Sequence, residues 1–147
     1  MRKQFALLLL SLSMLVATAP ASSYIVTRLA LTAARSRGRA FIVNGSFTVA
    51  AQQYRYWSFH VGRRGSSISG RFRAEGGGGN DIEVYVLDAD GFENFRNGHT
   101  ANTYYNSGRV TVGTINGRLA EGDYFLIFSN TFSVVTNKAV TASIELH

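Results

Sequence analysis

The chain has 147 residues, a formal net charge of +6 and no cysteine. Without cysteine it can form no disulfide, no lipoprotein anchor, no thiolate nucleophile and no thiolate metal site. Hydrophobic residues make up 46% of the chain and charged residues only 16%, and there is a single proline. This composition favours a folded domain over disorder, and the length predicts one domain with one hydrophobic core.

The first 21 residues have the pattern of an export signal. Arg2 and Lys3 give a positive start, a largely apolar run follows from Phe5 to Val16, and Ala19-Pro20-Ala21 supplies small residues for cleavage after Ala21. The apolar run is shorter than the ~20 residues that span a bilayer, so a cleaved signal peptide is favoured over an uncleaved anchor helix. The mature protein is then expected to be secreted or periplasmic, with no membrane span.

Residues 22–39 form a basic segment between the signal and the folded domain. Ile25, Leu29 and Leu31 fit either a strand or a short helix. The densest basic run, Arg35-Ser36-Arg37-Gly38-Arg39, contains no aromatic residue. Nucleic-acid-binding surfaces combine basic and aromatic side chains, so no nucleic-acid partner is expected. The segment is interpreted as a solvated linker.

Residues 40–147 have the pattern of an all-β domain. Short runs of alternating apolar and polar residues lie between turns rich in Gly, Asn, Asp and Ser, and no helix is expected among them. The alternation predicts antiparallel strands with one buried and one wet face. Seven or eight such strands predict an antiparallel β-sandwich. The side chains expected to face inward include Trp57, Phe59, Val61, Ile68, Phe72, Ala74, Ile82, Val84, Val86, Val110, Val112, Val140, Ala142, Ile144 and Leu146.

Glycine and asparagine predict two turns. Asn44-Gly45-Ser46 is typical of a tight hairpin turn and equally matches a glycosylation acceptor. Gly76–Gly79 is interpreted as a flexible hairpin connection rather than a phosphate-binding loop, because a phosphate-binding loop leads into a helix. Across this hairpin, Arg71 and Arg73 are expected to pair with Glu83.

Two parts of the domain resemble the GOLD domain. The first consists of Gly122–Ser133 with Lys138-Ala139-Val140. The second consists of Phe72–Gly77, Asn80–Val84, Asp88–Gly91 and Ser107–Val112. The GOLD domain is the β-sandwich of the membrane-anchored cargo receptors of the early secretory pathway. The resemblance covers about Phe47 to Leu146. It implies a GOLD-like, jelly-roll-like sandwich and a role in protein or lipid-associated recognition.

The chain departs from the pattern of the cargo receptors in two respects. Their domain carries a disulfide between two strands, whereas here Ile127 stands at one cysteine position and the other falls near Tyr56 or Trp57. The receptors also continue into a coiled coil, a membrane span and a cytosolic tail, and this chain ends at His147. Membrane anchoring and coat-protein sorting are therefore not expected of it.

The segment from Asp88 to Gly108 is the main candidate for a ligand site. It has no clear periodicity, and connections longer than ~12–15 residues are usually functional or disordered. Flat aromatic faces combined with amide side chains suit contacts to sugars, peptides or lipid headgroups. Alternatively, Phe92, Phe95 and one tyrosine fill the end of the sandwich while the asparagines satisfy the backbone. The candidate ligand-binding residues are Phe92, Asn94, Phe95, Asn97, His99, Asn102, Tyr104 and Tyr105.

A calcium site is a second hypothesis for this part of the chain. Asp88-Ala89-Asp90-Gly91 resembles the opening of a calcium loop, with Glu93 following and Asp81 as a further candidate ligand. Hard cations require several carboxylate and carbonyl oxygens at one point. The alternative is an ordinary Asx turn, in which the aspartates bond the local backbone. Calcium is the one cofactor considered.

The sequence offers little for catalysis. Its three histidines are His60, His99 and His147, and no nucleophile-elbow pattern surrounds any serine. The predicted function is therefore an exported, non-enzymatic recognition module that binds a protein or an envelope or glycan partner. The alternatives are a calcium-dependent carbohydrate-binding module and a purely structural envelope protein.

Overall fold

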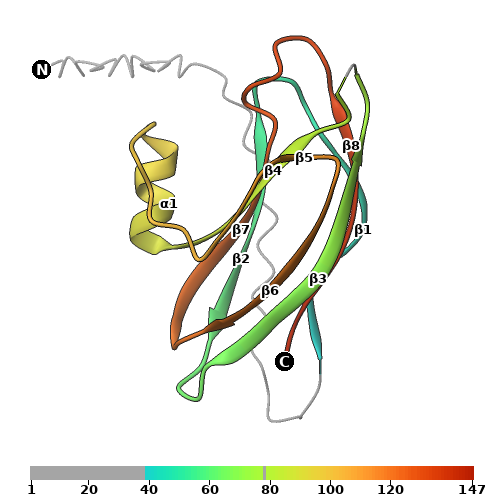
Figure 1. Cartoon of the computed structure of the whole chain (residues 1–147). Helices are drawn as coiled ribbons and strands as arrows, with labels where there is room; N and C mark the ends of the chain where they lie inside the picture. The colour runs from blue at the N-terminus through green and yellow to red at the C-terminus, as the bar shows by residue number, and fades with distance from the viewer. Residues whose placement is uncertain (1–38, 78) are drawn as a thin grey trace, which may run out of the picture.

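A computed structural model describes residues 39–77 and 79–147, which form two antiparallel four-stranded sheets and one helix (Figure 1). We call the sheets A and B. Sheet A has the order β2 (Tyr54–Val61), β7 (Gly122–Ser129), β4 (Ile82–Asp88), β5 (Tyr105–Val110). Sheet B has the order β1 (Ala40–Val49), β8 (Lys138–Leu146), β3 (Ser66–Glu75), β6 (Val112–Leu119). The predicted all-β sandwich of seven or eight strands is confirmed.

The core lies between the two sheets, where aromatic rings from both meet. Phe128 of β7 makes edge contacts with Phe47, Trp57 and Phe72, at ring-centroid distances of 5.0, 5.7 and 5.8 Å. Phe128 is fully buried and Phe72 is only 2% exposed. Edge-to-face pairs of this kind add to the free energy that apolar burial itself supplies, so this cluster holds the two sheets together.

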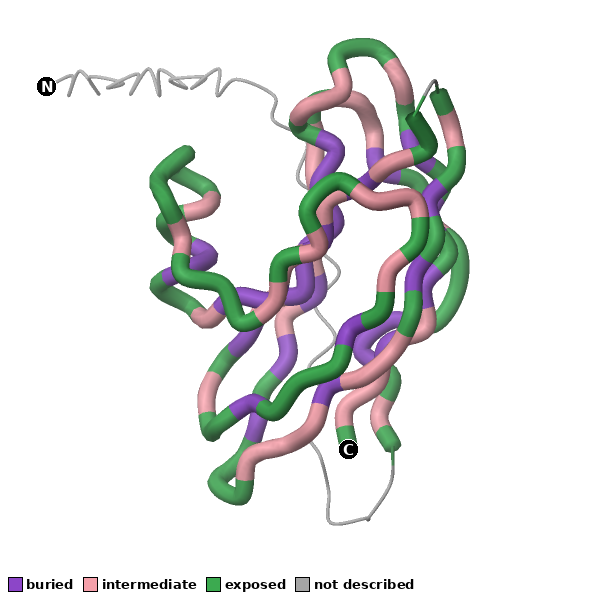
Figure 2. The backbone as a smooth tube through the Cα atoms, in the orientation of Figure 1, coloured by how far each residue is buried: buried purple, intermediate pink, exposed green. Residues whose placement is uncertain are grey.

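The predicted alternation holds along the strands, and Figure 2 shows buried positions alternating with exposed ones. In β3, Ile68, Phe72 and Ala74 are buried while Arg71 and Arg73 are exposed. Gly113 faces inward from β6, and a Cβ at that position would meet the ring of Phe72. Glycine is required there because the neighbouring phenylalanine occupies the space that a side chain would need.

The turn predictions were wrong at both sites. Asn44-Gly45 lies within the continuous strand β1, where Asn44 pairs with Ser143 of β8. Gly76–Gly79 does not join a hairpin, because β3 belongs to sheet B and β4 to sheet A. The expected pairing of Arg71 and Arg73 with Glu83 is therefore also wrong. Arg73 instead pairs with Glu75 at 3.0 Å, and Glu83 with Arg109 at 3.1 Å.

One inward prediction was wrong because the chain changes sheets at Thr111. Val110 ends β5 and packs against the core, whereas Val112 opens β6 and is 58% exposed. Moving from one sheet to the other shifts the alternation by one residue. The buried residues of β6 are accordingly Ile115 and Leu119.

The expectation that the domain contains no helix was also wrong. The helix α1 (Ala89–Arg96) follows β4 and lies against the outer face of sheet A (Figure 1). The predicted signal peptide and most of the basic segment lie outside the described residues. Within the part of the chain that is described, no helix has the length and apolar character needed to cross a membrane.

We expect Phe128→Ala to destabilise the domain by about 3–5 kcal/mol, because the substitution opens a cavity where four aromatic rings meet. The measurement is urea unfolding of the variant and the wild type. Phe41→Ala is the control, since Phe41 is 46% exposed, and it should change the stability by about 0.5 kcal/mol or less. Equal losses in the two variants would contradict the role given to the aromatic cluster.

Candidate functional site

The chain between β4 and β5 forms a compact structure that we call the α1 segment, residues 88–104. Asp88 caps its helix: the backbone N–H of Gly91 donates to Oδ1 at 2.8 Å. The hydroxyl of Tyr104 donates to Oδ2 of the same carboxylate at 3.3 Å. Gly91 is buried, and a Cβ there would lie 2.9 Å from the carbonyl oxygen of Asn102. One carboxylate therefore fastens both ends of the segment.

The apolar side of α1 forms a second, smaller core on the outer face of sheet A. The ring of Phe92 stacks on Phe125 of β7 with centroids 4.0 Å apart. Phe95 makes ring contacts with Tyr54 at 5.1 Å and with Tyr85 at 5.5 Å. These two residues pack as in the alternative considered from the sequence, although they lie on the outside of a sheet and not at the end of the sandwich. Phe92 is 5% exposed, and Phe95 is partly buried.

Tyr105 is also occupied by packing. It lies at the start of β5 and packs against the main core between the sheets. Burial raises the pKa of its phenol above the usual value. Of the candidate ligand-binding residues, the structure leaves on the outer side of the α1 segment a smaller set, which we call the α1 surface: Asn94, Asn97, His99, Asn102 and Tyr104.

Tyr104 is the one aromatic side chain on the α1 surface, and it is 52% exposed. Its ring makes an edge contact with Tyr124 at 5.1 Å. Desolvation raises the pKa of Tyr104, and Tyr124 and Asp88 add to the rise. The phenol therefore keeps its proton at neutral pH, donates to Asp88, and presents part of its ring to solvent.

The proposed calcium ligands are not brought together. Asp81 precedes β4 and accepts from Lys138, while Asp88 ends the same strand and caps α1. Asp90 lies in the first turn of α1, and Glu93 pairs with Arg96 at 2.9 Å. Among the described residues, no group of three or more His, Cys, Asp or Glu side chains could hold a metal ion. The Asx-type capping by Asp88 accounts for the pattern that resembled a calcium loop.

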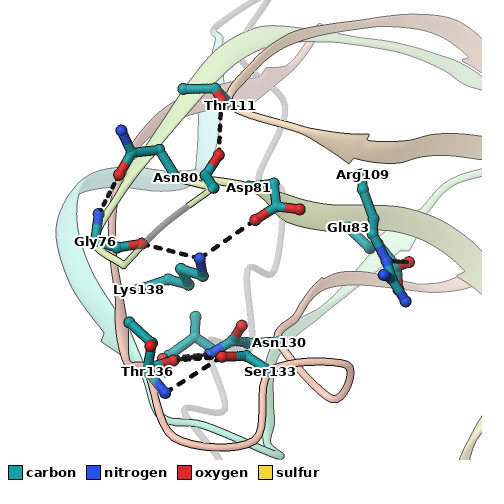
Figure 3. A network of polar contacts seen from close by, with 12 residues as sticks. Gly76, Asn80, Asp81, Glu83, Arg109, Thr111, Asn130, Ser133, Thr136 and Lys138 are labelled. Atoms are coloured by element: carbon teal, nitrogen blue, oxygen red, sulfur yellow. Dashed lines mark hydrogen bonds and ion pairs between the residues drawn. The ribbon is translucent and has the colours of Figure 1, made fainter.

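A network of polar contacts, shown in Figure 3, lies at the end of the sandwich away from Asp88. The ammonium group of Lys138 is buried, and it donates to the carbonyl of Gly76 at 2.9 Å and to Asp81 at 3.3 Å. A buried ammonium group is tolerated only where it has such partners. Lys138 therefore ties the connection between β3 and β4 to the start of β8.

Asn130 fixes the connection between β7 and β8 within the same network. It is fully buried, and its Nδ2 lies within hydrogen-bonding distance of the carbonyl oxygens of Val49, Ala50 and Thr136, at 3.3, 3.1 and 2.8 Å. Its Oδ1 has no partner within the described structure. Asn130 and Lys138 therefore hold loops in place.

The histidines lie apart from one another. His60 on β2 is 2.8 Å from Asp123 on β7, and both side chains are more than half exposed. His147 contacts Ser69 and Glu145, and His99 is exposed on the α1 surface. Exposed pairs of this kind are well solvated and contribute little energy.

No family model and no curated protein matches the chain. Among solved structures, a match is the periplasmic lysozyme inhibitor of g-type lysozyme, PliG, from Aeromonas hydrophila, with 17% identity over 79% of this chain and 96% of that chain and a TM-score of 0.37. A likeness of that size says nothing about function. Ile127 of β7 has Tyr56 of β2 as its register partner, and Trp57 is the partner of Leu126. The GOLD family stays a prediction.

We expect Asp88→Ala to loosen the α1 segment, because the helix loses its N-cap and Tyr104 loses its acceptor. Loss of a cap costs about 0.5–2 kcal/mol. Amide hydrogen exchange should become faster in α1 while that of β3 and β8 stays slow. The control is Glu121→Ala in the exposed turn before β7. Unchanged exchange of the α1 amides in Asp88→Ala would show that Asp88 does not hold the two ends of the α1 segment together.

Asn130→Asp should destabilise the domain more than Asn130→Ala. The alanine leaves buried carbonyl groups without their hydrogen-bond donor. Each buried carbonyl that loses its partner costs roughly 1–3 kcal/mol. The aspartate adds an acceptor oxygen where those carbonyls converge. Urea unfolding measures both, with Asn116→Asp on the exposed side of β6 as the control. Equal stability of Asn130→Asp and the wild type would contradict the role of Nδ2.

Proposed function

We propose that this chain is an exported, non-enzymatic binding module that recognises a protein partner through the α1 surface. The observation that carries the proposal is the division of the α1 segment into two sides. Phe92 and Phe95 are used in packing on sheet A, whereas Asn94, His99 and Tyr104 face solvent. The outer side therefore offers amide, imidazole and phenol groups to a partner.

The arrangement supports recognition of a large partner. Figure 1 shows α1 standing out from the outer face of sheet A, so that a ligand meets a raised surface. Raised surfaces suit macromolecules, whereas small ligands bind in concave sites. The amide, imidazole and phenol groups of the α1 surface supply hydrogen bonds and a flat ring, which are common in protein recognition.

The α1 surface is also held before any partner arrives. Asp88 joins the start of α1 to Tyr104, and the backbone N–H of Tyr104 donates to the carbonyl of Val86 at 2.8 Å. A surface ordered in advance loses less conformational entropy on binding. Export rests on the sequence of residues 1–21, with Arg2 and Lys3 before an apolar run.

The test is capture of the partner from the extracytoplasmic fraction of the source cell by tagged protein. Asn94→Arg should reduce recovery of the captured protein roughly tenfold or more, because it places a bulky charge on the exposed side of α1. Ala120→Arg adds the same charge in the exposed turn before β7 and should leave recovery unchanged. Thermal melts confirm that both variants are folded.

Equal recovery by wild type, Asn94→Arg and Ala120→Arg would reject the α1 surface as the site. Phe95→Ala is a poor test, because Phe95 supports α1 through Tyr54 and Tyr85. Loss of binding in that variant would not distinguish contact with the partner from loss of local structure.

A further inference from the structure

The two sheets differ in what covers their outer faces. Sheet A has α1 on its outer face, whereas none of the described elements packs on the outer face of sheet B. We call that surface the hydroxyl face, because most of its side chains are Ser, Thr or Asn. Its members are Phe41, Asn44, Ser46 and Thr48 of β1, Ala139, Thr141, Ser143 and Glu145 of β8, Ser67, Ser69, Arg71, Arg73 and Glu75 of β3, and Val112, Thr114, Asn116 and Arg118 of β6.

The register of the strands arranges these groups in a regular array. Ser46 lies opposite Thr141, and their hydroxyls are 2.8 Å apart. Arg71 has Ser143 on one neighbouring strand and Thr114 on the other. Side chains on one face of a strand repeat every ~6.8 Å, and strands lie ~4.8 Å apart. The hydroxyl face is therefore a regular array of hydrogen-bonding groups.

The charges on the hydroxyl face do not cancel. Glu75 is paired with Arg73, and Glu145 lies 3.8 Å from Arg39. Neither Arg71 nor Arg118 has a carboxylate within ion-pair distance in the described part of the chain. Arg118 lies opposite Ser67, four residues along β3 from Arg71, so these two arginines are roughly 14 Å apart by strand geometry. The face carries a surplus of positive charge.

The same face lacks the groups that other partners require. The exposed apolar residues on it are Phe41 and Val112, on the two edge strands of sheet B, and Ala139 on β8. They are not clustered, whereas protein interfaces depend on clustered aromatic or aliphatic anchors. Among the described residues, Phe41 is the one aromatic ring that its strands expose, whereas single-stranded nucleic acids are bound by stacking on a series of aromatic rings. What remains is hydrogen bonding to hydroxyls and attraction of anions.

We propose that the hydroxyl face binds a linear acidic polysaccharide, with Arg71 and Arg118 contacting its anionic groups and the Ser, Thr and Asn side chains contacting its hydroxyls. A polymer with regularly spaced carboxylates matches the surplus charge, and its hydroxyls match the array of hydrogen-bonding groups. This site lies on the opposite sheet from the α1 surface and is independent of the protein partner proposed there.

The test uses sodium alginate as the probe, dextran as the neutral control, and affinity electrophoresis of the full folded chain at low ionic strength. The wild type should be retarded by alginate and not by dextran. The double variant Arg71→Gln/Arg118→Gln should bind alginate about five- to tenfold more weakly, as measured from its retardation, because each lost contact is an exposed charge interaction. The matched control is Arg63→Gln/Arg64→Gln, which removes the same charge from the exposed turn between β2 and β3.

The control pair should lose less than about twofold, and added salt should weaken binding of the wild type because it screens exposed charges. Equal losses in the two double variants would overturn the proposal, since that result reports net charge rather than a site. Failure of alginate to retard the wild type would also overturn it. A third result would also overturn it: binding to phosphatidylglycerol vesicles depends on Arg71 and Arg118, and binding to alginate does not. That result would identify a membrane surface as the partner.

Discussion

The structure depends on the burial of β7 on both of its faces. Tyr124, Leu126 and Phe128 point into the core between the sheets, while Ile127 on the opposite face is also fully buried. A strand that is apolar on both faces must be covered twice. Sheet B supplies the inner cover and α1 the outer one. The helix is therefore a requirement of the apolar strand β7, and its position over the centre of sheet A follows from that requirement.

Polar side chains complete the domain by fastening its connections. At one end, Asp88 joins the two ends of the α1 segment, and at the other, Lys138 and Asn130 hold the connections between β3 and β4 and between β7 and β8. Burial raises the pKa of Tyr85 to about 12, with Glu83 adding to the rise, so this phenol also remains a neutral donor. Without a disulfide, these contacts restrict the loops of the sandwich.

The sequence predicted the strands and their inner faces well, and it failed where information beyond period two was needed. Alternation tells which side of a strand is buried, but it does not tell which strand lies beside it, so the change of sheet between β3 and β4 was missed. The helix was missed because Asp90, Gly91 and Asn94 have weak helix propensity, and its stability comes from packing of Phe92 and Phe95. The apolar run of β7 and the capping Asp88 were the available signals.

The sequence grouped the residues of the α1 segment into one set, and the structure divides that set for the same reason. Residues Phe92 and Asn94 lie in one turn of α1, yet one is 5% exposed and the other faces solvent. Composition could place both residues in a candidate functional segment. Only the position of sheet A shows that Phe92 packs on the sheet while Asn94 faces solvent. Sheet B has no such cover among the described residues, and its outer side chains are mostly hydrophilic. The domain thus carries two unlike surfaces. The α1 surface is raised and rests on apolar packing against sheet A, whereas the hydroxyl face is formed by the polar side chains of the strands of sheet B. The apolar outer side of β7 explains why the helix covers sheet A.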